Sequence, residues 1–487
     1  MIFFQLFLWY TSPMVRILLV LLLLLNTAHA EEGWFPYWFP ADPATAPDFQ
    51  GLPASTFNAG KDVLDPPAGK HGFLKVKDGH FYFEDGTRAR FWGTNLCFGA
   101  CFPEHKDAEI MANRIAYFGF NAVRLHHMDF YFEPNGIFED VAPAYKNAQM
   151  KPTGHLSPRQ LDKLDYLIYQ LKQRGIYINI NTLVARHFTE ADGVPDAEKL
   201  GMAAKPVSLF DAKLIELQKK YSKDLLTHYN LYTKLRYCDD PAICLVEINN
   251  ENTLVELNPS KLPEYYQKEL NGLTDNGKIS LAELEELYLK DMREYLKNTI
   301  GVKVPIGIGG QWNPKQLKLQ EECLDYVDKH GYWDHPQFPN RSWNMNDFRM
   351  HNRSMLADKN LGIIGDFKKC TPKNMPYVIS EWNHCYPNPY AHETPTLLAK
   401  TARQEDWDGL FQFDFGQGWK SFDTILNYFD ISSNAQQLIL CSYGGRIFLN
   451  NESPEVPFVG QIKNADSGWD KSGRFNWGIS PTLFKQP

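Results

Sequence analysis

The sequence has few cysteines and no concentrated charge. Eight cysteines in 487 residues are far fewer than a disulfide scaffold needs, and none has the CxxC or Cys/His spacing typical of zinc sites. The 50 Lys and Arg residues are spread along the chain and are outnumbered by 58 Asp and Glu, which gives a net charge of −8. This balance does not favour a nucleic acid or an anionic membrane as a partner. No stretch has a disordered composition, so we expect a globular protein.

Long apolar runs are also absent, except at the N-terminus. There Arg16 precedes the apolar run Ile17–Leu25, which is followed by Ala28-His29-Ala30. This pattern predicts a signal peptide over residues 1–30, with Met1 or Met14 as its true start. A membrane anchor is the weaker alternative, because the run is short for a bilayer span of about 20 residues. We therefore expect a secreted or periplasmic protein.

Export would permit disulfide bonds. Cys238 and Cys244 flank a predicted turn at residues 239–241, and a local bridge between them is one alternative. Aromatic residues, in contrast, are abundant at 14% of the chain, with 12 Trp and 24 Tyr. A large core uses many of them, but Trp and Tyr also suit stacking on sugar rings, because each combines an apolar ring with a polar group.

Residues 31–89 precede the main repeating pattern. Their first part is rich in Pro, Gly and aromatics and is predicted to be an irregular arm. Two alternating segments at 73–77 and 80–83 follow, separated by Asp78-Gly79, which indicates a β-hairpin. We expect this hairpin to cap the bottom of the domain that follows.

From residue 90 onward, short apolar strands alternate with helical stretches. Eight strands are predicted, at 90–96, 122–126, 176–183, 243–250, 304–308, 326–331, 377–380 and 410–415. Helices are predicted between them, including 103–118, 157–174 and 214–236. Eight such units predict an α/β fold, a TIM (β/α)8 barrel over residues 90–487 with a C-terminal tail. An open doubly wound sheet is the rival, but no Gly-rich phosphate turn follows any strand.

Two glutamates end predicted strands. Glu251 follows the fourth strand and Glu381 follows the apolar part of the seventh. A carboxylate in this position is costly to desolvate and contributes little to packing. Strands four and seven lie across the mouth of a barrel, where two carboxyl groups can flank one glycosidic bond. Hydrolysis of such a bond needs an acid for the leaving oxygen and a second carboxylate that attacks or activates water.

Three motifs in this strand order resemble clan A glycoside hydrolases. They are Asn250-Glu251 on strand four, His330-Gly331-Tyr332 on strand six and Ser380-Glu381-Trp382 on strand seven. Within the clan the chain is most similar to glycoside hydrolase family 5, the cellulase and mannanase family, over roughly residues 73–445. The resemblance implies an enzyme that cleaves a β-linked polysaccharide or oligosaccharide with retention and needs no cofactor and no metal.

The resemblance also implies roles for single residues. Glu251 would be the acid/base and Glu381 the nucleophile, with Arg124 close to Glu381. Asn250 would bind the sugar 2-hydroxyl, and Tyr332 would donate a hydrogen bond to Glu381.

Further residues are expected to line the site. His330 would lie near the acid/base, and His126 is a better candidate than His127 because it shares a strand face with Arg124. The sequence departs from the family on strand eight, where a Trp usually forms the floor under the sugar. Here either Trp419, beyond the strand, or Phe413 must take that place.

Two alternatives come from other classes. One is a barrel that binds carbohydrate without cleaving it. The other is a metal-dependent barrel hydrolase, suggested by His126, His127, Asp129, His330 and His384. The metal hypothesis needs two histidines on strand one, and that strand offers only Asn95 and Cys97.

Overall fold

The computed structural model describes residues 34–37, 41–45, 57–130, 132–139, 152–310, 313–344, 347–418, 427–452, 462–464 and 482–485. The predicted signal peptide at 1–30 and the predicted site residue Trp419 lie outside these residues. None of the helices in the described part is both long enough and apolar enough to span a bilayer.

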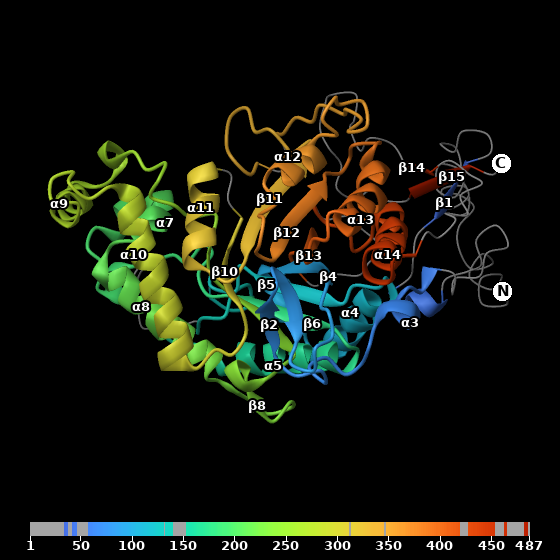
Figure 1. Cartoon of the computed structure of the whole chain (residues 1–487), viewed down its shortest axis with the longest axis horizontal. Coiled ribbons are helices and arrows are strands. Elements are labelled where there is room, and N and C mark those ends of the chain that lie inside the picture. Colours follow the sequence, from blue (N-terminus) through green and yellow to red (C-terminus); the bar gives the residue numbers. More distant parts are fainter. Residues whose placement is uncertain are drawn as a thin grey trace, which may run out of the picture.

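Eight parallel strands form one sheet in the order β10-β9-β6-β5-β4-β13-β12-β11. The strands β10 and β11 stand at the two ends of this order and contact each other, so the sheet curls into a barrel (Figure 1). The TIM barrel is therefore confirmed. The strand bounds are β4 Phe91–Cys97, β5 Ala122–His126, β6 Tyr177–Asn181, β9 Ile243–Asn250, β10 Ile306–Gly309, β11 Val327–Trp333, β12 Tyr377–His384 and β13 Gly409–Gly416.

Helices surround the strands (Figure 1). The longer ones are α4 His105–Tyr117, α5 Pro158–Gln173, α8 Ala212–Leu226, α9 Glu264–Leu273, α10 Leu281–Glu294, α11 Pro314–Cys323, α13 Thr394–Gln404 and α14 Ala435–Asn450. Short helices are α3 Gly60–Val63, α6 Ala197–Leu200, α7 Ala204–Val207 and α12 Ile363–Lys369. The helix α5 begins as its sequence predicts: the Ser157 side chain accepts a hydrogen bond from the Gln160 backbone, and Pro158 occupies the first turn.

The predicted helix over 214–236 is correct only in its first part. It ends at Leu226, and a hairpin of β7 Tyr229–Asn230 and β8 Leu235–Arg236 follows. The Asn230 side-chain oxygen accepts hydrogen bonds from the backbone of Tyr232 (2.8 Å) and Thr233 (3.1 Å). These local bonds give the backbone an alternative to the helix, which explains the difference.

A second hairpin closes the lower end of the barrel, as predicted. It consists of β2 Leu74–Lys77 and β3 His80–Phe83. Leu74 and Phe81 are fully buried and cluster with residues at the beginnings of barrel strands, such as Phe91 and Tyr177. The carboxylate of Asp408 ties the hairpin down, because it accepts from the backbone N–H groups of Phe81 (3.1 Å) and Tyr377 (3.0 Å).

The hypothesis of a Cys238–Cys244 bridge is wrong, because both cysteines are free. Cys244 lies inside β9, and its thiol donates to the Ile178 carbonyl of the neighbouring strand (3.3 Å). The thiol therefore takes part in a hydrogen bond between two strands of the barrel. A separate three-stranded sheet joins β1 Trp34–Tyr37, β15 Thr482–Lys485 and β14 Ile462–Asn464.

Close packing inside the barrel gives a test of the fold. A Cβ at Gly307 of β10 would lie 2.2 Å from the ring of Tyr326, which is fully buried. We expect Gly307→Ala to lower the free energy of unfolding by about 1–3 kcal/mol in urea titrations. Gly272→Ala is the matched control, because its Cβ would meet no neighbour on α9. That control should be neutral or stabilising, and equal effects at both positions would contradict this packing.

Candidate active site

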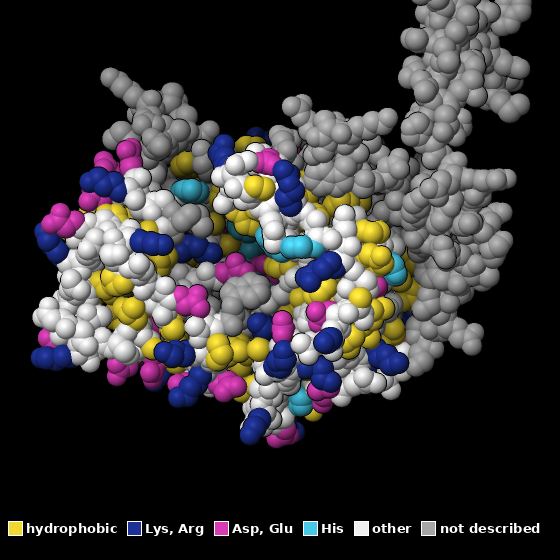
Figure 2. Space-filling model, turned by 90° about the horizontal axis from the view of Figure 1, so that it is seen from above, with side chains coloured by type: hydrophobic (Ala, Val, Ile, Leu, Met, Phe, Trp, Pro, Cys, Tyr) yellow, Lys and Arg dark blue, Asp and Glu magenta, His cyan; other side chains and the backbone are white. Residues whose placement is uncertain are grey.

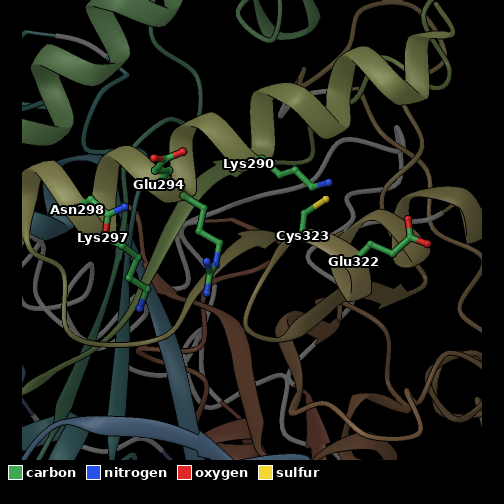
Figure 3. A pocket seen from close by; sticks show the side chains of 7 residues that line it. Lys290, Glu294, Lys297, Asn298, Glu322 and Cys323 are labelled. Carbon is green, nitrogen blue, oxygen red and sulfur yellow. The ribbon is translucent and has the colours of Figure 1, made fainter.

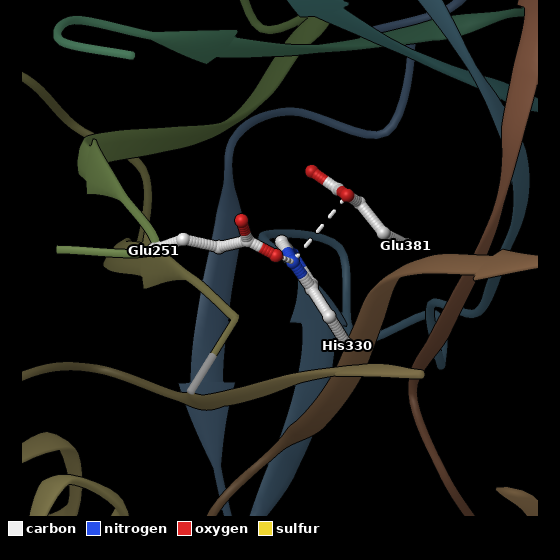
Figure 4. Close-up of side chains that lie close together, drawn as sticks. All are labelled: Glu251, His330 and Glu381. Atoms are coloured by element: carbon white, nitrogen blue, oxygen red, sulfur yellow. Dashed lines mark hydrogen bonds and ion pairs between the residues drawn. The ribbon is translucent and has the colours of Figure 1, made fainter. Parts of the chain in front are cut away.

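The two predicted catalytic glutamates lie close together at the carboxyl end of the barrel. Glu251 comes directly after β9, and Glu381 lies within β12. One oxygen of each carboxylate and one His330 ring nitrogen lie within 4.8 Å of one another (Figure 4). The backbone of Glu251 has a φ of +46°, a conformation that a residue with a side chain adopts at a cost. This turn directs its carboxyl group toward Glu381.

Glu381 is surrounded by hydrogen-bond donors. Arg124 Nη1 donates to its Oε1 at 2.8 Å, and the Tyr332 hydroxyl donates to its Oε2. His126 Nε2 lies 3.4 Å from Oε1, and the Glu381 residue is only 4% exposed. A buried cation and a hydroxyl donor therefore contact the two oxygens of this carboxylate.

Glu251 has a different environment. Its side chain is 34% exposed at the mouth of the barrel and lies 2.8 Å from His330 Nδ1. Desolvation by the surrounding protein raises its pKa, against the opposing charges of Lys205 and Arg124. One carboxyl group is therefore shifted toward the protonated form while the other is held by a cation, the division of roles that acid–base chemistry requires.

His330 connects the two glutamates without carrying a charge. Its ring is fully buried, and burial lowers its pKa to about 4. A neutral imidazole has one donor and one acceptor nitrogen. In this structure Nδ1 faces Glu251, and Nε2 lies 2.8 Å from the Ser380 hydroxyl.

The strand register explains why Arg124 reaches so many partners. Arg124 is level with Asn95 on β4 and with Asn179 on β6, and all three side chains are fully buried. Its Nη1 donates to Asn95 Oδ1 (3.0 Å) and its Nη2 to Asn250 Oδ1 (2.7 Å). Arg124 thus orients Asn250 as well as Glu381.

Sequence reasoning missed Glu247, which also binds Arg124. Burial alone would lower the pKa of the Arg124 guanidinium, but Glu247 and Glu381 more than compensate and raise it. The signal was present in the sequence: Glu247 is a charged residue within an apolar strand, four positions before Glu251. Such a residue needs a buried partner of opposite charge.

Aromatic rings lie beside the carboxylates. Phe413 is buried, and its ring centroid is 5.7 Å from His126 and 6.0 Å from Tyr332, edge-on to both. Phe413 therefore packs against two of the side chains that lie next to Glu381. His127 does not face Glu381 but stacks on Phe98 at 4.3 Å.

The group Glu251, His330 and Glu381 is compact enough to hold a metal ion. However, the Arg124 guanidinium already lies 2.8 Å from Glu381, and a fixed positive charge there opposes a bound cation. The other members of the metal hypothesis have structural partners. Asp129 accepts from the Val184 backbone (2.8 Å), and His384 Nδ1 pairs with the Thr394 hydroxyl (2.9 Å).

A separate cavity of about 380 Å³ lies between α10 with its π-helical end, Tyr295–Ile300, and α11 (Figure 3). Its cations are already paired, Lys290 with Glu286 and Arg293 with Asp325. On the face shown in Figure 2, the described Lys and Arg side chains are interspersed with Asp and Glu. Neither feature competes with the carboxylate pair as the candidate site.

Solved structures resemble this fold, whereas no protein-family model and no curated protein matches the sequence. The endo-1,4-β-mannanase of Rhizomucor miehei has a TM-score of 0.52 at 14% identity, covering 78% of this chain and 100% of its own. The endo-β-1,4-mannanase of Thermotoga petrophila has a TM-score of 0.53 at 15% identity, covering 79% and 81%. The glycoside hydrolase family 5 mannosidase of Rhizomucor miehei has 0.51 at 14%, covering 78% and 98%.

These neighbours bear out the predicted resemblance at the level of the fold. The chain shares its (β/α)8 barrel with these three structures.

The Tyr332 hydroxyl offers a test of the site. We expect Tyr332→Phe to lower kcat/KM by about 10- to 100-fold, because a hydrogen bond to a charged group is lost while the ring remains packed. Kinetics on an aryl β-glycoside would measure this loss. Tyr326→Phe is the matched control, since its buried hydroxyl has no partner among the described residues. Equal kcat/KM values for Tyr332→Phe and Tyr326→Phe would show that the Tyr332 hydroxyl makes no contribution to the site.

Proposed function

We propose that this protein is a retaining glycoside hydrolase that acts on β-linked oligosaccharides or polysaccharides. The observation that carries the proposal is the distance between the carboxylates, whose facing oxygens lie within 4.8 Å. Retaining enzymes place the two carboxyl groups about 5–5.5 Å apart, whereas inverting enzymes need about 6.5–9.5 Å to admit water. The fold that the neighbours share is consistent with this reaction.

In the first step, Glu381 Oε attacks the anomeric carbon while Glu251 transfers its proton to the leaving oxygen. The glycosidic bond breaks, and a glycosyl ester with Glu381 forms. In the second step, Glu251 takes a proton from water, whose oxygen attacks the same carbon and releases Glu381. The raised pKa of Glu251 suits both proton transfers. Asn250, held by Arg124, would bind the sugar 2-hydroxyl.

A carbohydrate-binding barrel without catalysis is the alternative from another class. It would not need a carboxylate pair with unequal environments, one paired with a cation and one with a raised pKa. Those unequal environments favour the enzyme. The pattern at residues 1–30 supports the further proposal that the protein is exported.

The carboxylate roles can be separated by chemical rescue. We expect Glu251→Gln and Glu381→Gln each to lose at least about a thousandfold in kcat/KM with an unchanged circular dichroism spectrum. With an activated aryl β-glycoside, azide should give an inverted glycosyl azide from Glu381→Ala and a retained one from Glu251→Ala. Small losses in both Gln variants would contradict the proposal, and exchanged azide products would reverse the two roles.

An exposed aromatic residue near the mouth gives a test of glycan binding. Trp343 is 60% exposed and packs on His335 (5.8 Å), whose ring lies 5.3 Å from Tyr332. Asp334 anchors this loop by accepting from the backbone of His351 and Asn352, each at 2.7 Å. We propose that Trp343 stacks on a sugar ring beyond the cleaved bond.

Trp343→Ala should raise KM for a long glycan by about 3- to 10-fold, the loss of one aromatic stacking contact. The rate on an aryl monoglycoside, which does not reach this ring, should stay unchanged. Tyr229→Ala is the control, because Tyr229 is similarly exposed (48%) on a distant hairpin. An equal KM for both variants on the long glycan would exclude this contact.

A further inference from the structure

Glu247 is a buried carboxylate that cannot touch the substrate. It lies within β9, is 0% exposed, and its carboxylate contacts the Arg124 guanidinium. Arg124 Nε lies 2.9 and 3.1 Å from the two Glu247 oxygens, and Nη2 lies 2.7 Å from Oε2. This fork-to-fork pairing fixes the plane of the guanidinium.

Two routes of polar contacts lead from Glu247 to Glu381. The first passes through Arg124, whose remaining nitrogen Nη1 donates to Glu381. The second passes through Asn181, which donates to Glu247 and contacts His126 Nδ1. The other nitrogen of His126 lies 3.4 Å from Glu381. Glu247 therefore orients both basic side chains that face Glu381 from β5.

The buried network around Arg124 contains more carboxyl groups than cations. Glu247 and Glu381 share one guanidinium, and a third carboxyl group, Asp328, is buried close to it. Burial, reinforced by the charge of Glu247, raises the pKa of Asp328 well above its ordinary value. His126 adds no positive charge, since burial lowers its pKa well below its ordinary value. Without Glu247, the whole charge of Arg124 would fall on Glu381.

We propose that Glu247 is a positioning residue that divides the charge of Arg124 between two carboxylates and thereby keeps Glu381 nucleophilic. The inference rests on the proposed function of Glu381 as the nucleophile. A carboxylate that alone neutralises a buried guanidinium is stabilised in its free form. Its attack on carbon then has a higher barrier, because the ground state is bound more tightly than the transition state.

The test compares Glu247→Gln, which removes the charge, with Glu247→Asp, which keeps it on a shorter side chain. We expect Glu247→Gln to lower kcat on an aryl β-glycoside by about 10- to 100-fold with KM within about twofold. The acidic limb of the kcat/KM profile should move to lower pH by about one unit, because Glu381 alone then faces Arg124. Glu247→Asp should leave this limb in place and recover part of kcat.

Asp165→Asn is the matched control for losing a buried carboxylate. Asp165 is 3% exposed on α5, outside the barrel, and accepts from the Tyr237 hydroxyl at 2.6 Å. Its loss should lower the melting temperature without moving the pH profile. If Glu247→Gln does not fold, Glu247→Asp still decides. A lower kcat with the wild-type KM and melting temperature supports the inference, whereas an unchanged kcat, or a kcat that falls only together with the melting temperature, overturns it.

A purely structural role would give Glu247→Gln and Glu247→Asp the same kcat and the wild-type acidic limb, and this result would overturn the inference. Failure of the proposed function is seen separately, since Glu381→Gln would then keep its activity. If Glu381→Gln loses its activity but the acidic limb of Glu247→Gln does not move, the role of Glu247 is rejected and the proposed function stands.

Discussion

One buried guanidinium organises the candidate site. Arg124 is fully shielded from water, and an isolated charge in that position would cost several kcal/mol. The cost is offset because its donors all find acceptors, on Glu247, Glu381, Asn95 and Asn250. These partners come from the three strands β4, β9 and β12, and Arg124 itself stands on β5, so the barrel must close in one register for the charge to be satisfied. The same contacts that stabilise the interior therefore set the geometry at the mouth.

The chemical difference between the two glutamates follows from their distance to this cation. Glu381 lies against Arg124 and is almost inaccessible, whereas Glu251 stands on a turn at the rim and meets a neutral imidazole instead. Identical side chains acquire different properties because β12 and β9 deliver them to different depths. A barrel suits this purpose, since the carboxyl ends of all its strands converge at one face.

The sequence predicted the fold well because strand ends are marked by abrupt changes in polarity. The strands at 122–126 and 243–250 were predicted at their observed bounds. The helix beyond Leu226 was wrong because the Asn230 side chain forms a local turn that the apolar period does not reveal. Glu251 and Glu381 were predictable because each comes directly after a predicted strand. Glu247 was not recognised, since its partners Arg124 and Asn181 come from other strands, and only the closed barrel brings them together.

The proposed reaction and the choice of sugar would depend on different parts of this molecule. The carboxylates and their donors stand on strands, where the register leaves little freedom. Of the two rings that would contact a sugar, Phe413 also lies on a strand, β13, whereas Trp343 stands on a loop after β11. Loops change sequence at little cost to the barrel, whereas a change at Arg124 disturbs four strands at once. The pair Glu251 and Glu381 therefore defines the chemistry more firmly than any ring defines the sugar.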